Sequence, residues 1–228
     1  MYETLRFTIE IVSTVLFFIL AWFMLKPYRY TRESRYLGLP LGFTFMGVSD
    51  IFLAIGVINP FETFRIVSLI TRTFAFVFLT VTYFFSKKPS KNSQLIWNAT
   101  LSLLIVFLIT TSLLLVSIPQ FGIEAPTSLS VAFRIIDLLC IIYISIQCLR
   151  SHIQKPEPTT IWIPIGYIFF GISQYSLLIR AMESDYSFGF AFFGGLTARL
   201  IGIAIFLIVT YSAFHRPKNG GTNEKNTA

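Results

Sequence analysis

Long apolar runs alternate with short polar segments along the whole chain. Each run holds about 20 predominantly apolar residues, the length that an α-helix needs to cross the hydrocarbon core of a bilayer. Because a backbone in lipid must satisfy its own hydrogen bonds, runs of this length predict helices. The predicted spans are 7–25, 37–58, 65–85, 95–118, 128–149, 161–181 and 190–214. The pattern therefore predicts an all-α polytopic membrane protein with seven transmembrane helices.

The composition also indicates that lipid is the solvent of this chain. Hydrophobic residues make up 54% of the sequence and charged residues 13%, whereas a soluble domain has about 25% charged residues. The connecting segments are too short for a separate folded domain, so we expect a single membrane domain over 1–214. The segment 215–228 is polar and rich in Gly and Asn, which predicts a disordered cytoplasmic tail.

Basic residues are distributed unevenly between the two sides of the predicted bundle. The segments after the first, third and fifth spans, together with the tail, hold Lys26, Arg29, Arg32, Arg35, Lys87, Lys88, Lys91, Arg150, Lys155, Arg216, Lys218 and Lys225. The N-terminal segment and the other connections hold only Arg6, Arg65 and Arg180. Since cytoplasmic loops carry the excess of Lys and Arg, we expect an extracytoplasmic N-terminus, a cytoplasmic C-terminus and a location in the cell membrane. Topology then explains the formal charge of +7, and we expect no nucleic-acid partner.

Two parts of the chain resemble each other. The segment 40–50, PLGFTFMGVSD, matches the segment 164–174, PIGYIFFGISQ, in a proline, two glycines, an aromatic pair and a serine at the same spacing. Arg72 in the third span matches Arg199 in the last span, and each is followed by a distal Thr-Tyr pair. These matches predict an internal repeat.

The repeat predicts a 3+1+3 arrangement of the helices. Glu10 in the first span and Asp137 in the fifth span form a weaker third match. We therefore expect one repeat over 7–85, a connector helix over 95–118 and a second repeat over 128–214. A single connector helix restores the original direction, so the two repeats are predicted to be parallel.

Polar residues inside the predicted spans are the candidate binding residues: Glu10, Asp50, Arg72, Arg134, Asp137, Gln174 and Arg199. Counted from the extracytoplasmic ends of the spans, the charged ones lie about 9–15 Å deep. A charge in hydrocarbon is costly unless it is compensated, so we expect a balanced layer of acids and arginines. In each repeat the acid of the first helix can face the arginine of the third, which pairs Glu10 with Arg72. The same rule pairs Asp137 with Arg199.

Asp50 and Arg134 are the charged residues that this rule leaves without a partner. Arg134 can also pair with Asp137, which follows three residues later on the same helix. Buried ion pairs can be purely architectural, whereas ionisable residues inside a membrane mark functional sites by default. We favour a functional site, because a whole layer of charges is a costly way to fix the register of helices.

The sequence offers no arrangement that is typical of catalysis or of metal binding. The histidines, His152 and His215, lie in a cytoplasmic connection and at the tail, so no cluster of His, Cys and carboxylates has metal-ligand spacing. No Gly-rich phosphate loop and no nucleophile elbow is present. We therefore expect neither enzyme activity nor a bound metal.

The number and orientation of the helices resemble those of the microbial rhodopsins, and Thr197-Ala198-Arg199 stands where that family places its retinal-binding lysine. No predicted span contains a lysine, and a guanidinium stays protonated, so we expect no retinal cofactor. The parallel arrangement is also similar to that of the SWEET and PQ-loop transporters. That family has a Pro-Gln pair, but neither Pro40 nor Pro164 is followed by glutamine.

These features favour a small-solute or ion transporter-like protein. Arg72 and Arg199 would attract a small anionic or polar ligand into a pocket that is open to the outside. A first alternative is a seven-helix sensor or receptor that signals to a separate cytoplasmic protein partner. A second alternative is a non-catalytic subunit of a membrane complex, in which the charges bridge to another chain or to a second copy.

Overall fold

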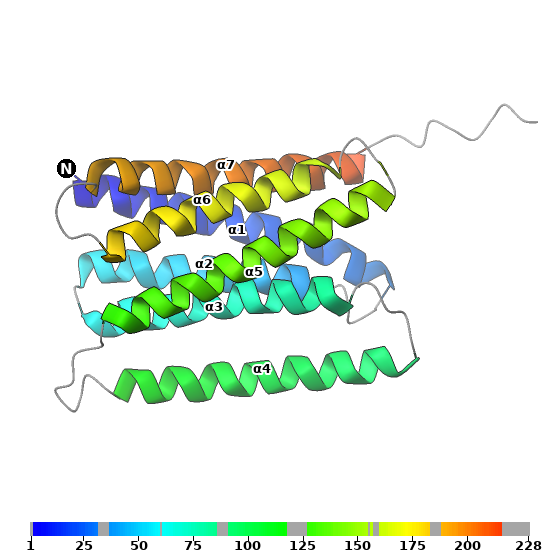
Figure 1. The fold of residues 1–228 in the computed structure, drawn as a ribbon, viewed down its shortest axis with the longest axis horizontal. Coiled ribbons are helices and arrows are strands. Elements are labelled where there is room, and N and C mark those ends of the chain that lie inside the picture. Colours follow the sequence, from blue (N-terminus) through cyan, green and yellow to red (C-terminus); the bar gives the residue numbers. More distant parts are fainter. Residues whose placement is uncertain are drawn as a thin grey trace, which may run out of the picture.

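In the part of the chain that it describes, the computed structural model consists of seven α-helices (Figure 1). The described residues are 2–31, 37–59, 61–85, 91–117, 127–154, 156, 160–182 and 188–215. The helices are α1 (Tyr2–Thr31), α2 (Gly38–Ile58), α3 (Glu62–Phe85), α4 (Lys91–Ser117), α5 (Thr127–Gln154), α6 (Trp162–Met182) and α7 (Phe188–His215). All are long and apolar enough to cross a membrane, which confirms the predicted helical fold. Apart from His215, the predicted tail lies outside the described residues.

Helix α1 is longer than expected, because it continues past Pro27. A proline inside a helix removes one backbone hydrogen bond, but this one stands close to the helix end. Two cation–π contacts stabilise the last turns: Lys26 Nζ lies 4.8 Å from the ring centroid of Phe23, and Arg29 Cζ lies 4.5 Å from that of Trp22. Lys26 lies just outside the predicted first span, 7–25, but within the membrane-length stretch of α1, Thr4–Tyr30.

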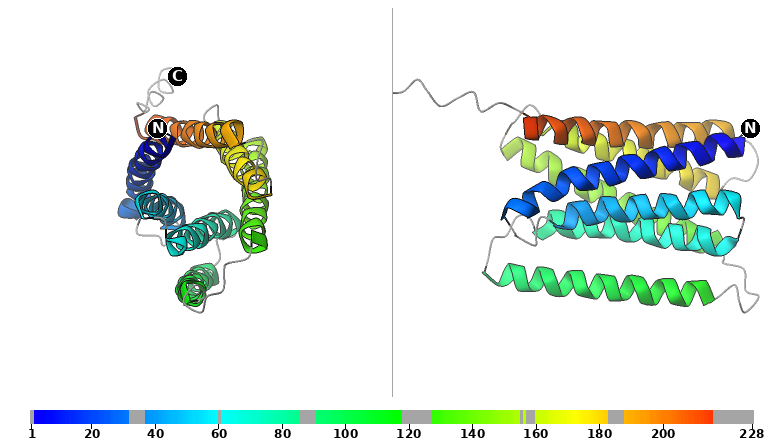
Figure 2. Two further views of the ribbon diagram at one scale, coloured as in Figure 1. Left: turned by 90° about the vertical axis from the view of Figure 1, so that its left-hand side faces the viewer. Right: turned by 180° about the vertical axis from the view of Figure 1, so that it is seen from behind.

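Six of the helices, all except α4, form a ring around an interior, and α4 lies outside this ring (Figure 2). Each ring helix packs on its neighbours in the order α1, α2, α3, α5, α6, α7 and back to α1. Helix α4 packs on the outer side of α3, where Leu101, Leu104 and Leu108 meet an apolar cluster around Phe74. Trp97 is also buried, against Phe85, whereas most of the remaining large apolar side chains of α4 are exposed, as expected for a helix that faces lipid.

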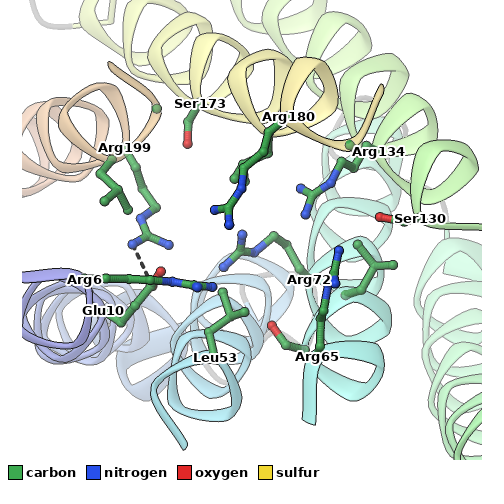
Figure 3. Close-up of a pocket in the computed structure, with 16 residues that line it drawn as sticks. Arg6, Glu10, Leu53, Arg65, Arg72, Ser130, Arg134, Ser173, Arg180 and Arg199 are labelled. Carbon is green, nitrogen blue, oxygen red and sulfur yellow. Dashed lines mark hydrogen bonds and ion pairs between the residues drawn. The ribbon is translucent and has the colours of Figure 1, made fainter. Parts of the chain in front are cut away.

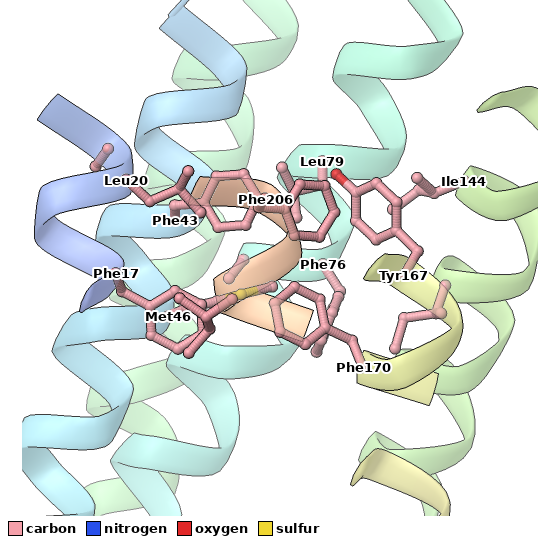
Figure 4. Packing of buried hydrophobic residues seen from close by; sticks show 14 of the residues in the cluster. Phe17, Leu20, Phe43, Met46, Phe76, Leu79, Ile144, Tyr167, Phe170 and Phe206 are labelled. Atoms are coloured by element: carbon pink, nitrogen blue, oxygen red, sulfur yellow. The ribbon is translucent and has the colours of Figure 1, made fainter. Parts of the chain in front are cut away.

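Apolar side chains, many of them aromatic, fill part of the ring interior (Figure 4). All the ring helices contribute to this cluster, which we call the aromatic core. Its largest members are Phe17, Leu20, Phe43, Met46, Phe76, Leu79, Ile141, Ile144, Tyr167, Phe170, Ile203 and Phe206. The ring of Phe206 lies at its centre, 5.4 Å from Phe43, 5.5 Å from Phe170 and 4.8 Å from Tyr167 between ring centroids. In a membrane such close packing holds helices together, because lipid supplies no hydrophobic driving force between them.

Two glycines let neighbouring ring helices approach closely. A Cβ atom at Gly42 on α2 would lie 2.7 Å from the Cγ of Leu79 on α3. A Cβ atom at Gly166 on α6 would lie 2.8 Å from the ring of Phe206 on α7. Both facing residues belong to the aromatic core, so these glycines set the spacing of the α2–α3 and α6–α7 pairs.

We expect Gly42→Ala to lower the free energy of unfolding by about 1–3 kcal/mol, because Leu79 has to move within a packed core. Gly194→Ala on α7 is a matched control, since a Cβ atom added there would meet no atom within 4 Å. That change is expected to be neutral or to stabilise by up to about 1 kcal/mol, because alanine favours helix. Unfolding in mixed detergent micelles, followed by tryptophan fluorescence, measures both. Equal effects would contradict the packing role of Gly42.

Candidate functional site

A partly open cavity of about 200 Å³ lies at the end of the ring where α1 begins (Figure 3). We call it the arginine cavity, because its charged lining residues are Arg6, Arg65, Arg72, Arg134, Arg180, Arg199 and Glu10. Ser68, Ser130 and Ser173 add hydroxyl groups to the lining. Among the described residues, a single carboxylate thus shares this lining with six guanidinium groups.

Four buried side chains form an ion-pair network at the floor of the arginine cavity. The Asp50 Oδ1 atom accepts hydrogen bonds from Arg72 Nη2 at 2.5 Å and from Arg199 Nη1 at 3.0 Å. The second terminal nitrogen of Arg199 donates to Glu10 Oε2 at 2.7 Å. All four residues are at most 5% exposed, so water screens their interactions weakly. The network has no net charge and joins α1, α2, α3 and α7.

The partners in this network differ from those that the repeat predicts. Glu10 was expected to face Arg72. Because α7 packs on α1, Glu10 instead forms its ion pair with Arg199. Asp50 was expected to lack a charged partner, but it binds both arginines. The predicted pairings, including that of Asp137 with Arg199, are thus wrong. Which charges meet depends on the neighbours around the ring and not on equivalent positions within each repeat.

The remaining candidate residues lie on α5 and α6. Arg134 donates through Nη1 to Gln174 Oε1 at 3.4 Å, which is long for a hydrogen bond, and not to Asp137. Asp137 is completely buried, and among the described residues neither of its carboxyl oxygens has a hydrogen-bond partner. Thr73, Arg72 and Arg134 are the groups that face it. Among the described residues, Asp137 therefore has no ion pair at hydrogen-bond distance, unlike Asp50.

The candidate residues gather in one region of the ring interior. Those that line the arginine cavity are Glu10, Arg72, Arg134 and Arg199. Asp50 and Gln174 lie directly behind them, where they border a void of about 10 Å³. The apolar residues around that void, Phe17, Met46, Phe76 and Phe170, belong to the aromatic core. The charged residues therefore rest on the aromatic core, which fills the ring behind the cavity.

Three lining arginines are missing from the sequence-based site. Arg6, Arg65 and Arg180 are assigned there to the extracytoplasmic side as minor exceptions to the charge rule. In the structure each lies within a helix and lines the arginine cavity. The sequence did contain a signal for them, because basic residues are rare on the predicted extracytoplasmic side. The topology rule gives no reason for three arginines there, so a binding role could have been considered.

The chemistry of this lining favours anions. A guanidinium presents N–H donors in a planar fork that matches the oxygens of carboxylates and phosphates. Several such groups around a recess in a low-dielectric bundle focus positive potential on it. No protein-family model, curated protein or solved structure matches this chain, so its function has to be inferred from the arginine cavity itself.

Proposed function

We propose that this integral membrane protein binds a small anion from the extracytoplasmic side and is a transporter-like protein of the cell membrane. The arginine cavity is the observation that carries this proposal, because six arginines converge on about 200 Å³ at one end of the bundle. The orientation is the one inferred from the basic segments, which puts the start of α1 outside. An anion that arrives from that side meets Arg6 and Arg65 before it reaches Arg72 and Arg199. Neither catalysis nor a cofactor is part of the proposal.

We also propose that α1–α3 and α5–α7 are two parallel repeats, with α4 as the connector between them. The order of helices around the ring supports it, since α3 packs on α5 just as α7 packs on α1. A twofold axis along the bundle would exchange these two contacts. The packing of Gly42 on Leu79 and of Gly166 on Phe206 supports it too, because these contacts occupy equivalent places.

The first helices of the two repeats, α1 and α5, align differently when their buried faces are compared. The sequence matched Glu10 with Asp137. On α1 the buried residues include Ser13, Phe17 and Leu20, and on α5 they include Asp137, Ile141 and Ile144 at the same spacing. Aligned in this way, Arg134 replaces Glu10, and Asp137 replaces Ser13. Where α7 meets α1, the Glu10 carboxylate binds Arg199. At the equivalent place, where α3 meets α5, Arg134 stands in the position of Glu10 and repels Arg72. The second repeat thus has a base where the first has an acid, and an external anion would compensate the positive charge of that base.

Arg134→Gln tests the proposed binding with little risk to folding, because Arg134 lies outside the ion-pair network. We expect orthophosphate to raise the thermal midpoint of the purified protein, since a ligand at 100 times its Kd stabilises by about 2.7 kcal/mol. The variant is expected to bind about tenfold more weakly, because a charge-assisted hydrogen bond is lost. Arg150→Gln, an exposed position at the other end of α5, is the matched control and should bind like the parent. An affinity for orthophosphate that is the same in Arg134→Gln as in the parent would contradict the proposed binding site.

A receptor is the second candidate, and the aromatic core favours it. This core fills the ring behind the cavity with side chains from every ring helix, so passage of a solute would require it to open. Uptake of radiolabelled phosphate into liposomes separates the two functions. Uptake that falls in Arg134→Gln supports a transporter. Binding without any uptake supports a sensor that signals to a cytoplasmic partner.

A further inference from the structure

Guanidinium groups outnumber carboxylates around the arginine cavity. Glu10 lines it, and Asp50 and Asp137 lie behind the lining, close to Arg72. Arg180 takes part in another interaction and is left out of the charge balance. The other five arginines of the lining face three carboxylates among the described residues. A singly charged anion would leave part of this positive potential uncompensated, whereas a doubly charged anion would balance it.

The surplus charge extends along the axis of the bundle. On α3, Arg65 precedes Arg72 by two turns, which separates their backbones by about 10 Å. On α1, Arg6 precedes Glu10 by one turn. The cavity therefore has a rim with Arg6 and Arg65 and a floor with Arg72 and Arg134, and all these side chains point into it (Figure 3). An anion with two charged groups can contact the rim and the floor at the same time.

The uncharged part of the lining limits the skeleton of the ligand. Its described members are three serines, four leucines, an alanine and a glycine: Ser68, Ser130, Ser173, Leu53, Leu69, Leu177, Leu196, Ala181 and Gly195. Proteins that hold bases or other aromatic rings commonly stack them on aromatic side chains, and the described lining has none. The serine hydroxyls can donate to oxyanion oxygens. A cavity of about 200 Å³ thus fits a compact, non-aromatic oxyanion.

We infer that the arginine cavity binds compact non-aromatic anions that carry at least two negative charges on phosphate or carboxylate groups, and that it discriminates against monovalent anions. This inference rests on the proposed function and specifies its ligand. The surplus of guanidinium groups sets the charge of the ligand, and their spread from rim to floor sets its two-ended shape.

Isothermal titration of the purified full-length protein at constant ionic strength tests the inference with three probes: pyrophosphate, citrate and acetate. We expect pyrophosphate or citrate to bind at least about tenfold more tightly than acetate, because a second charged group contacts a second set of guanidinium groups. The better of the two multivalent probes identifies phosphate or carboxylate as the preferred group, and either result supports the inference.

Arg65→Gln supplies the second readout, since Arg65 is exposed at the rim and lies outside the four-residue ion-pair network of the floor. The variant is expected to bind the better multivalent probe about tenfold more weakly and acetate within about twofold of the parent. Arg150→Gln should change neither. Acetate binding as tight as that of the multivalent probes, or an equal loss for both in Arg65→Gln, overturns the inference alone. If neither these three anions nor orthophosphate binds, the proposed function fails with it.

Discussion

Asp50→Asn is expected to lower the free energy of unfolding by about 3–5 kcal/mol, the cost of removing one partner from a buried ion pair. The carboxylate binds Arg72 and Arg199 through the same oxygen. An asparagine can still accept one hydrogen bond there, but it leaves two guanidinium groups facing a single acid, Glu10. Because these side chains are buried, water cannot replace the lost charge. A denaturant titration in mixed detergent micelles measures the change.

Asp137→Asn is the matched control for this prediction. It removes the same charge from a completely buried position at a similar level of the ring, but from a carboxyl group without a hydrogen-bond partner among the described residues. No close ion pair is lost, and the asparagine side chain can still interact with Thr73, so we expect a change within about 1 kcal/mol. Double-mutant cycles with Arg72→Gln should give a coupling energy above about 1 kcal/mol for Asp50 and a smaller one for Asp137. Equal losses in the two variants would contradict the different roles assigned to these carboxylates.

The sequence was informative about which residues share a depth in the membrane. The length of each apolar run fixes a span, and the position within a span fixes a depth, so Glu10, Asp50, Arg72, Arg134 and Arg199 could be assigned to one layer without any knowledge of packing. Both properties follow from the constant rise of a helix. The structure brings these residues together around the arginine cavity and its floor.

The sequence was less informative about which charges meet. Partners depend on the rotation of each helix about its axis and on the order of helices around the ring, and neither follows from depth. Glu10 therefore seemed matched to Arg72, although the closing contact between α7 and α1 gives it Arg199. Arg6 and Arg65 were missed for another reason, since long side chains near a helix end can point into the bundle as well as toward water.

Glu10→Gln is expected to strengthen the binding of pyrophosphate by about ten- to hundredfold. Glu10 is the carboxylate of the described cavity lining, and it holds Arg199 at 2.7 Å. An incoming anion competes with it for that guanidinium and is repelled by its charge. Two unit charges about 6 Å apart interact by about 3 kcal/mol at an effective dielectric constant near 20, which sets the upper end of the range. Isothermal titration at constant ionic strength measures the affinity.

Glu62→Gln is the control for this last prediction, because Glu62 is exposed in the first turn of α3 and outside the cavity lining. It changes the net charge equally, and we expect it to alter the affinity by less than about twofold, since exposed charges are screened. The sign of the Glu10→Gln effect separates two roles for the charged layer. If the layer only fixes the helices, losing Glu10 weakens the fold and creates no affinity. If Glu10 occupies a guanidinium that the ligand needs, the same change makes the protein less stable and a tighter binder.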